Sequence, residues 1–424
     1  MTEKYKTIFI AGILIALKDE DFEKEYSTYK TFDKLFSSLT HSIGKVLKEK
    51  VPDEKVKSIS SDIEKIGGNT VLKFIPLNQD NSLKWYIIQL AKIKPMMDNS
   101  SESVDALGIF YHEFVKYTGG DGSGLGIVLT SQHLTEFMVK LAGVHKNRKV
   151  VDICCSSGAF LVTAMCEMMK DANENEIKEI KKESLFDVEN NSDIYTLAIT
   201  NMIVRGDGKS NIEHGDCFDE EITNKLKNEQ INVGLINSPY SQKDHCELEF
   251  VEHLLDMLTN NGVGAVVVPM SCAIGIKFKD VRERLFKEHT LNAVFSMPGD
   301  IFYSNNANTN VCVIVLIAHR SHGTSHKTFF GYCKDDGFVK VKKLGRIDKF
   351  NKWGSIKDDW YNLYHDHIVK DEMTTYRHVN WNDEWLCEAY MDTDYSKLTD
   401  ADFEKTITDY PAYLVKSGNI NGKS

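Results

Sequence analysis

No Cys-x-x-Cys pair occurs in the 424 residues, although the chain has nine cysteines. Zinc sites and disulfide frameworks usually show closely or regularly spaced cysteines, so we expect neither a metal site nor a disulfide framework. The longest early apolar run, residues 8–17, is too short to cross a bilayer, and no cleavage signature follows it. It predicts a helix in an N-terminal helical region. We therefore expect a cytoplasmic protein without a membrane partner.

The most informative feature that is present is one tetrapeptide: Asn237, Ser238, Pro239 and Tyr240. It follows an apolar run, residues 233–236, that predicts a buried strand. An Asn amide oxygen can accept one N–H of an exocyclic amine, and the carbonyl before a proline, which has no competing N–H, can accept the other. Tyr240 offers a ring for stacking. This arrangement would hold an adenine amino group for methylation, but Asn-x-Pro is also an ordinary turn.

A second feature is a predicted strand at 149–155 that leads through small residues at 156–159 into an apolar helix at 160–169. In an open α/β sheet such a loop borders a ligand crevice, and the helix N-terminus favours an anionic group. A structural turn is the alternative. The position of the loop, about 85 residues before the tetrapeptide, favours a cofactor site. The candidate residues of this segment are Asp152, Cys155, Ser156, Ser157, Gly158, Ala159 and Phe160.

Two carboxylates lie between these features. Glu189 ends a predicted second strand, where it could accept both ribose hydroxyls of a nucleoside cofactor. Asp216, followed by Cys217, ends a third, where it could accept the amino group of the cofactor's adenine. As isolated residues they are more often helix caps or surface charges. In series with the loop and the tetrapeptide they fit one site.

With these residues the chain resembles the modification (N6-adenine DNA methyltransferase) subunits of type I and related restriction-modification systems. The family's glycine loop is similar to residues 152–161, and its Asn-Pro-Pro-Tyr/Phe signature to residues 237–240. Its Tyr/Leu-Thr-Pro segment is similar to residues 126–133, which contain Thr130. The resemblance runs from about residue 105 to the end of the sequence.

The resemblance implies an α/β fold of the S-adenosylmethionine-dependent methyltransferase class, a mostly parallel sheet with one antiparallel strand. It implies S-adenosyl-L-methionine as the cofactor, with Thr130 among the cofactor-binding residues, and N6 of a flipped adenine in duplex DNA as the acceptor. The implied partners are duplex DNA, a separate DNA-specificity subunit with two modification subunits per recognition subunit, and possibly a restriction subunit.

The sequence departs from the family pattern at four positions. Ser156 and Ala159 replace glycines, and Ser131 and Ser238 replace prolines. If position 156 needs a positive φ, a serine there carries backbone strain. Ser238 lacks the fixed φ of proline. Two alternatives therefore stay open: a catalytically weak or inactive structural subunit that clamps DNA or a partner, and a protein glutamine N5-methyltransferase, which shares the Asn-Pro-Pro-Tyr logic.

Positive charge is scarce, with 51 Lys and Arg against 62 Asp and Glu and a net charge of −11. DNA affinity comes largely from phosphate neutralisation, so an acidic chain favours a DNA-gripping partner subunit. The basic stretches 277–287 and 327–352 are local exceptions. The second could touch phosphate or could be a solvated hairpin edge, and it could also read DNA directly in a homodimer.

Three regions follow from the patterns along the chain. Residues 1–118 predict a helical N-terminal domain, including a helix within 29–50. A glycine-rich segment, 118–126, predicts either a hinge or a mobile loop near the cofactor. Residues 126–320 alternate strands and helices as a catalytic domain, and residues 321–424 predict a C-terminal extension with a hairpin at 328–341 followed by helices.

Overall fold

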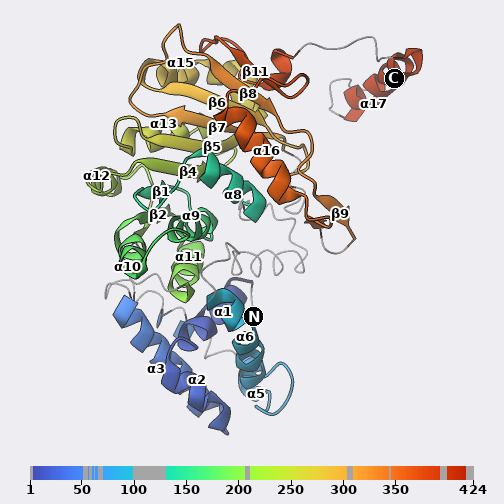
Figure 1. Cartoon of the computed structure of the whole chain (residues 1–424). Coiled ribbons are helices and arrows are strands. Elements are labelled where there is room, and N and C mark those ends of the chain that lie inside the picture. The colour runs from blue at the N-terminus through green and yellow to red at the C-terminus, as the bar shows by residue number, and fades with distance from the viewer. Residues whose placement is uncertain are drawn as a thin grey trace.

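A nine-stranded mixed sheet with helices on both faces forms the centre of the molecule (Figure 1). The computed structural model describes residues 3–50, 56, 60–61, 63–64, 70–98, 130–205, 211–302, 309–342, 345–391 and 399–416. The strand order is β11-β8-β6-β7-β5-β4-β1-β2-β3. The strands are β1 (Val150–Asp152), β2 (Leu185–Glu189), β3 (Asn211–His214), β4 (Val233–Asn237), β5 (Val263–Pro269), β6 (Thr290–Ser296), β7 (Val311–Ile317), β8 (Thr328–Tyr332) and β11 (Thr374–Arg377).

Helices cover both faces of this sheet, which explains why its central strands are apolar without interruption. In β5 the alternating side chains enter different cores: Ala265 and Val267 pack on one face, and Val266 and Val268 on the other. The helices of the first face are α8 (Gln132–Leu141), α9 (Ala159–Met169), α10 (Glu174–Glu183), α11 (Ser192–Val204) and α16 (Trp353–His365). Those of the second are α12 (Glu220–Asn228), α13 (Glu247–Met257), α14 (Met270–Ile274) and α15 (Lys279–Glu288).

The N-terminal helices pack directly against the sheet domain. They are α1 (Glu3–Ala16), α2 (Glu20–Glu25), α3 (Phe32–Lys50), α5 (Thr70–Phe74) and α6 (Leu83–Asp98). Helix α1 contacts α11 as well as α3 and α6, and residues 8–17 are buried from end to end. The apolar run at 8–17 is thus a helix buried within the protein, as the sequence predicted. None of the described helices is long and apolar enough to cross a membrane.

Strand β7 runs antiparallel to β5 and β6, as the resemblance implied, and a second antiparallel strand, β11, pairs with β8 at the sheet edge. The predicted hairpin at 328–341 is wrong. Strand β8 pairs with β6 and β11, whereas β9 (Val339–Val341) forms a separate two-stranded sheet with β10 (Gly345–Ile347). Local strand propensity could not reveal these partners, because β11 lies about 40 residues further along the chain.

The expected division of the chain stays a prediction, although β8 and β11 extend the sheet beyond residue 320. The last described helix, α17 (Asp400–Lys416), extends away from the sheet in Figure 1. The glycine-rich segment at 118–126 lies outside the described residues.

A buried ion network fastens the β9–β10 sheet to α8. The Asp336 carboxylate, which is fully buried, accepts hydrogen bonds from both terminal nitrogens of Arg346 at 2.7 and 2.9 Å. The His133 Nε2 atom on α8 lies 3.3 Å from the same carboxylate, and its ring stacks on Phe338 at 4.2 Å. Burial alone would raise the pKa of Asp336, but the His133 imidazole and the Arg346 guanidinium lower it to about 2.

We predict that Asp336→Ala lowers the free energy of unfolding by about 3 kcal/mol, because the buried Arg346 guanidinium loses its bidentate partner and keeps only the partly exposed Asp300 carboxylate at 3.1 Å. The exposed pair of Lys140 and Asp358, at 2.6 Å, provides the control, and Asp358→Ala should cost about 0–1 kcal/mol. Chemical denaturation measures both. The Asp336 pKa is depressed, so its contribution should be complete above the ordinary value of 3.8 and disappear as the pH falls towards 2. Equal effects of the two substitutions would contradict this.

Candidate active site

A cavity of about 720 Å³ opens where the carboxyl ends of β1, β2, β3 and β4 meet. Its position follows from the strand order. From β1 the chain continues to β2 and β3 on one side, whereas β4 and β5 lie on the other side, so the order of the strands reverses between β1 and β4. Ligands of open α/β sheets bind at such a switch point. The lining residues are Ile153, Cys154, Ser156, Glu189, Asn190, Asn191, Ile194, Gly215, Asp216, Cys217, Phe218, Asn237, Ser238, Pro239, Tyr240, Gln242, Asp244, His245 and Phe250. The volume suits a nucleotide-sized ligand.

The Asn237 amide at the end of β4 is held by two neighbours. Its Nδ2 donates to the Thr130 hydroxyl at 3.1 Å, and its Oδ1 accepts from the Tyr240 hydroxyl at 3.0 Å. Burial raises the pKa of Tyr240, so the phenol stays protonated and remains a donor. Thr130 was predicted to contact the cofactor, but the structure places it against Asn237 and outside the cavity lining.

Ser238, which stands where the family signature has a proline, is tied to the neighbouring strand. Its backbone N–H and its side-chain hydroxyl both donate to the Val267 carbonyl of β5, each at 3.3 Å. A proline could make neither bond. Pro239 additionally restricts the backbone of Ser238 to extended conformations. The turn is thus constrained by hydrogen bonds to β5 in place of a second pyrrolidine ring.

The loop after β1 contains the strain that the sequence suggested. Ser156 adopts φ = +51°, the left-handed region that favours glycine, and Gly158 adopts φ = +82° at the start of α9. The Ser156 N–H donates to Glu189 Oε2 at 2.9 Å, which helps to hold this conformation. The Ser156 hydroxyl oxygen is buried and has no hydrogen-bond partner among the described residues. Ser156 is also one of the residues that line the cavity.

The cavity is acidic on the side of Glu189. Burial raises the pKa of Glu189, while the backbone N–H groups of Ser156 and Asn191, the latter at 2.7 Å, oppose that shift. Asp152 lies beneath the loop; burial raises its pKa, and the nearby charge of Glu189 raises it further. A cation that enters the cavity beside Glu189 would favour the ionised form of this carboxyl group and, at longer range, that of Asp152 beneath the loop.

The opposite end of the cavity is aromatic. The Phe218 ring stacks on His245 at 3.8 Å and on His253 at 4.5 Å, and Phe250 meets it edge-on at 5.0 Å. Asp216 accepts the Phe218 N–H at 3.0 Å, which shapes the turn after β3. A flat ring system bound here would have apolar faces beside it and a carboxylate at its edge.

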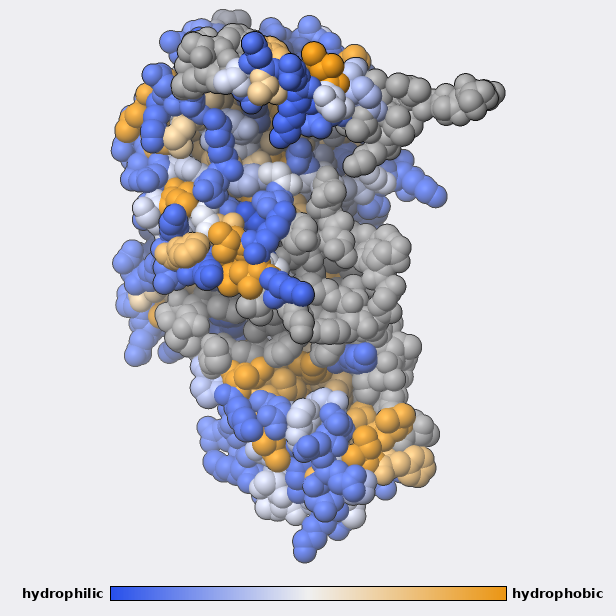
Figure 2. Space-filling model, turned by 90° about the vertical axis from the view of Figure 1, so that its right-hand side faces the viewer, coloured by the Kyte–Doolittle hydropathy of each residue, from blue (hydrophilic) through white to orange (hydrophobic). Residues whose placement is uncertain are grey.

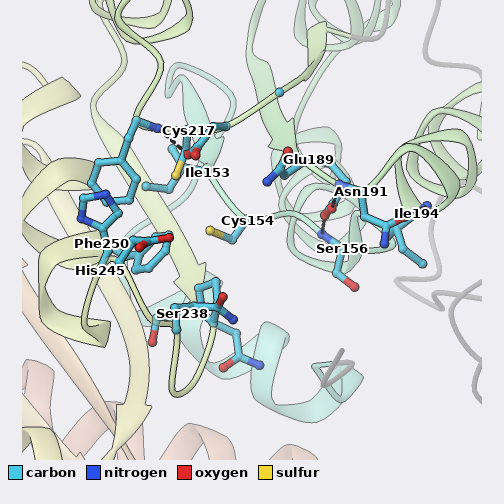
Figure 3. A pocket seen from close by; sticks show the side chains of 18 of the residues that line it. Ile153, Cys154, Ser156, Glu189, Asn191, Ile194, Cys217, Ser238, His245 and Phe250 are labelled. Atoms are coloured by element: carbon cyan, nitrogen blue, oxygen red, sulfur yellow. Dashed lines mark hydrogen bonds between the residues drawn. The ribbon is translucent and has the colours of Figure 1, made fainter. Parts of the chain in front are cut away.

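Figure 3 shows these groups around one space: Glu189, Asn191 and Ser156 lie on one side, His245 and Phe250 on the other, and Cys154 lies between them. Eight predicted site residues line the cavity: Ser156, Glu189, Asp216, Cys217, Asn237, Ser238, Pro239 and Tyr240. The other seven do not line it: Thr130, Asp152, Cys155, Ser157, Gly158, Ala159 and Phe160. Most of these seven are buried beneath the loop or in α9, where they can position the lining residues. Their functional roles stay predictions.

Several lining residues were not predicted from the sequence. Asn190 and Asn191 follow Glu189 directly, and Phe218 follows Cys217, so extension of each predicted loop by one or two residues would have found them. His245 and Phe250 carry no local signal, because only the fold brings the start of α13 against the turn after β3.

Comparison with known proteins decides the family. The family described as N-6 DNA Methylase matches residues 102–412. The chain belongs to this family. It is 35% identical over 335 residues to the type II restriction enzyme and methyltransferase RM.BcgI of Heyndrickxia coagulans, covering 76% of this chain and 52% of that protein. It is 21% identical over 382 residues to the type I restriction enzyme MjaVII methylase subunit of Methanocaldococcus jannaschii, covering 82% of this chain and 63% of that protein. It thus spans less than two thirds of the length of either relative.

Solved structures share the fold of this family member. A structure described as the basis of complex assembly and conformational transition of the type I R-M system superposes with a TM-score of 0.66 at 15% identity, covering 99% of this chain and 93% of that one. The type I restriction-modification methyltransferase subunit of Streptococcus thermophilus gives a TM-score of 0.59 at 17% identity, covering 92% of this chain and 93% of that one. The α/β methyltransferase fold expected from the sequence is confirmed.

We predict opposite effects of glycine at two neighbouring positions. Ser156→Gly should raise the free energy of unfolding by up to about 1 kcal/mol, because glycine removes the steric strain of the left-handed conformation. The greater entropy that glycine gives the unfolded chain offsets part of this gain. Ala159→Gly, in the first turn of α9, should lower it by about 0.5–1 kcal/mol, since glycine is a poor helix former. Urea unfolding of both variants measures the difference. Destabilisation of equal size at both positions would contradict strain at Ser156.

Proposed function

We propose that this chain transfers a methyl group from S-adenosyl-L-methionine to N6 of an adenine flipped out of duplex DNA, as the modification subunit of a restriction-modification system. The observation that carries the proposal is a single cavity that joins the Asn237 turn to the loop around Ser156 and Glu189. A methyl acceptor and a methyl donor would meet there. Membership of the N-6 DNA Methylase family supports the same reaction.

The Asn237 turn supplies the contacts for the target amine. The hydrogen bond from Asn237 Nδ2 to the Thr130 hydroxyl fixes the orientation of the amide. Asn237 Oδ1 is therefore held as a hydrogen-bond acceptor, and in the structure its donor is the Tyr240 hydroxyl. An adenine amino group would donate to this oxygen and to the Ser238 carbonyl. These two hydrogen bonds draw the nitrogen lone pair away from the ring, while Tyr240 stacks on the base. Extrusion of the base costs roughly a few kcal/mol, which the pocket contacts offset.

The other side of the cavity fits the proposed cofactor. Glu189 would accept the ribose hydroxyls on the lone pairs that Ser156 and Asn191 leave free. The Ser156 hydroxyl has no partner among the described residues and would bind the polar end of the cofactor. Asp216 would accept from the adenine amino group, and the aromatic cluster of Phe218, His245 and Phe250 would lie beside the adenine ring. When bound, S-adenosyl-L-methionine supplies an electrophilic methyl on a cationic sulfur, so alignment of the acceptor matters more than a strong base.

We predict that Asn237→Ala reduces methyl transfer to background while cofactor binding and thermal stability stay near wild type. Thr130→Val should give an intermediate loss, because it keeps the acceptor oxygen but releases the amide that carries it. The assay is incorporation of tritiated methyl into DNA, with calorimetry of the cofactor on the same preparations. Wild-type turnover by the Asn237 variant would rule out its contact with the amine.

We predict that Glu189→Ala weakens S-adenosyl-L-methionine binding by about 1.5–3 kcal/mol, the range for hydrogen bonds to a charged group. Glu213→Ala, on the neighbouring strand β3 and paired with Lys225 outside the cavity, is the control and should leave binding unchanged. Isothermal titration calorimetry measures both constants. An unchanged constant for the Glu189 variant would refute the ribose contact.

We further propose that a separate specificity subunit reads the DNA sequence in a cytoplasmic complex with two modification subunits, which a restriction subunit can join. The chain's net charge of −11 supports this division of labour. Helix α17 carries exposed apolar side chains at i, i+4 and i+7, namely Phe403, Ile407 and Tyr410, a spacing suited to pairing with a partner helix. Two relatives are named as type I methylase subunits.

We predict that the isolated chain binds DNA weakly and without sequence preference. Phosphate contacts alone position a protein on a duplex but do not distinguish sequences. A gel-shift titration at physiological salt, with the modified sequence and a scrambled duplex side by side, measures the preference. Tight and selective binding by the isolated chain would exclude the separate specificity subunit.

A further inference from the structure

We propose that residues 348–352, the turn between β10 and α16, are a docking surface for the phosphate backbone of duplex DNA. This inference rests on the proposed function, because the DNA must be held beside the cavity while one base leaves the stack. It assigns the contact to a defined element of this chain, whereas sequence reading remains with the partner. We call residues 348–352 the phosphate turn.

Positive charge is concentrated around the phosphate turn. Residues 340–357 contain seven Lys or Arg and a single acidic residue, in a chain whose net charge is −11. Three of these cations pair with the body of the protein: Lys340 with Asp300 at 3.1 Å, Arg346 with Asp336 at 2.7 Å, and Lys357 with Glu136 at 3.0 Å.

The cations of the turn itself are different. Lys349 and Lys352 are exposed, and no carboxylate of the described residues lies within 4 Å of either ammonium group. The single acid of the segment, Asp348, uses its carboxylate to accept backbone N–H groups. The two ammonium groups are therefore free to bind an anion, and they are the kind of contact that neutralises phosphates.

An exposed aromatic ring lies between these two lysines. Phe350 is 59% exposed, and the ammonium groups of Lys349 and Lys352 lie 5.7 and 5.8 Å from its ring centroid. Lysines beside an apolar side chain match a nucleic-acid backbone, in which phosphates alternate with apolar sugar faces. Proteins that deform DNA also press phenylalanine against base steps. The backbone of a DNA duplex could thus contact both lysines through its phosphates and the phenylalanine ring through its sugars.

The phosphate turn is rigid before any partner binds. The Asp348 carboxylate accepts the N–H of Lys352 at 2.8 Å and that of Trp353 at 3.0 Å, which closes the turn around Asn351 at φ = +50°. Trp353 is buried, and its indole N–H donates to Glu136 of α8 at 3.1 Å. Binding would therefore order the two lysine side chains and little backbone, which limits the entropic cost.

A chain of contacts links the phosphate turn to the cavity. Asn237 contacts Thr130, and three residues after Thr130 the His133 ring contacts Asp336. Asp336 in turn holds Arg346, two residues before the turn. Figure 1 shows β9 beside the end of α16, on the face of the sheet that also carries α8. Figure 2 views that side of the molecule, where hydrophobic residues gather in the centre and in a band above the N-terminal helices, and hydrophilic residues make up most of the rest of the coloured surface. The turn is followed by a residue, Trp353, that contacts the first turns of α8, and α8 begins two residues after Thr130.

The test compares the full-length double variant Lys349→Ala/Lys352→Ala with the control Lys178→Ala/Lys227→Ala, which removes two exposed lysines from α10 and α12. The probe is a fluorescein-labelled random-sequence duplex, titrated at several salt concentrations, with a single-stranded RNA of equal length beside it. The turn variant should bind the duplex roughly tenfold more weakly and lower the slope of log K against log salt by about 1 to 2. Phe350→Ser should weaken binding severalfold with the slope unchanged.

The control variant should retain the wild-type affinity and slope, and all variants should keep wild-type melting and S-adenosyl-L-methionine binding. A turn variant that matches the control overturns the inference while leaving the proposed function intact. Loss of RNA binding without loss of duplex binding overturns the choice of DNA as the partner. A wild-type protein that binds cofactor but no duplex at low salt overturns both the inference and the DNA substrate of the proposed function.

Discussion

The parallel pairing of β1 with β4 is the constraint on which the candidate site depends. Val150 and Val151 pair with Val233 and Gly234, so both strands present their carboxyl ends at one edge of the sheet. Strand β4 continues two residues further than β1 in this register, which is roughly 7 Å of extended chain. The loop after β1 and the turn that begins at Asn237 both line the cavity. A one-residue shift of this register would turn the Asn237 side chain to the opposite face.

Two of the four replacements of family glycines and prolines, Ser156 and Ser238, are accommodated by hydrogen bonds. Glu189 braces the left-handed Ser156 through its N–H, and Val267 receives both donors of Ser238. In each case a polar contact from a neighbouring strand supplies part of the constraint that the missing residue would have imposed through its backbone. The strain at Ser156 is local, since Gly158 supplies the other left-handed position of the loop.

Sequence reasoning named eight of the residues that line the cavity because their signals are local. Asn237 through Tyr240 follow a strand directly, and Glu189 and Asp216 each end or follow one, so chain order and the switch-point rule bring them to one edge. The same reasoning failed where partners are distant. The strands β8 and β9 are close in sequence but do not pair with each other. Strand β8 pairs with β6 and β11, and β9 pairs with β10. His245 and Phe250 reach the cavity only through the packing of α13, and the contact of Thr130 with Asn237 spans 107 residues.

The central claim is that the two halves of this cavity serve one reaction on DNA. Base-resolved mapping of N6-methyladenine in the host genome, with the gene present and with it deleted, tests that claim most directly. The account predicts that methylation at one recognition sequence disappears on deletion and returns with the wild-type gene, while other methylated sites stay unchanged. Identical methylation maps with and without the gene would contradict it.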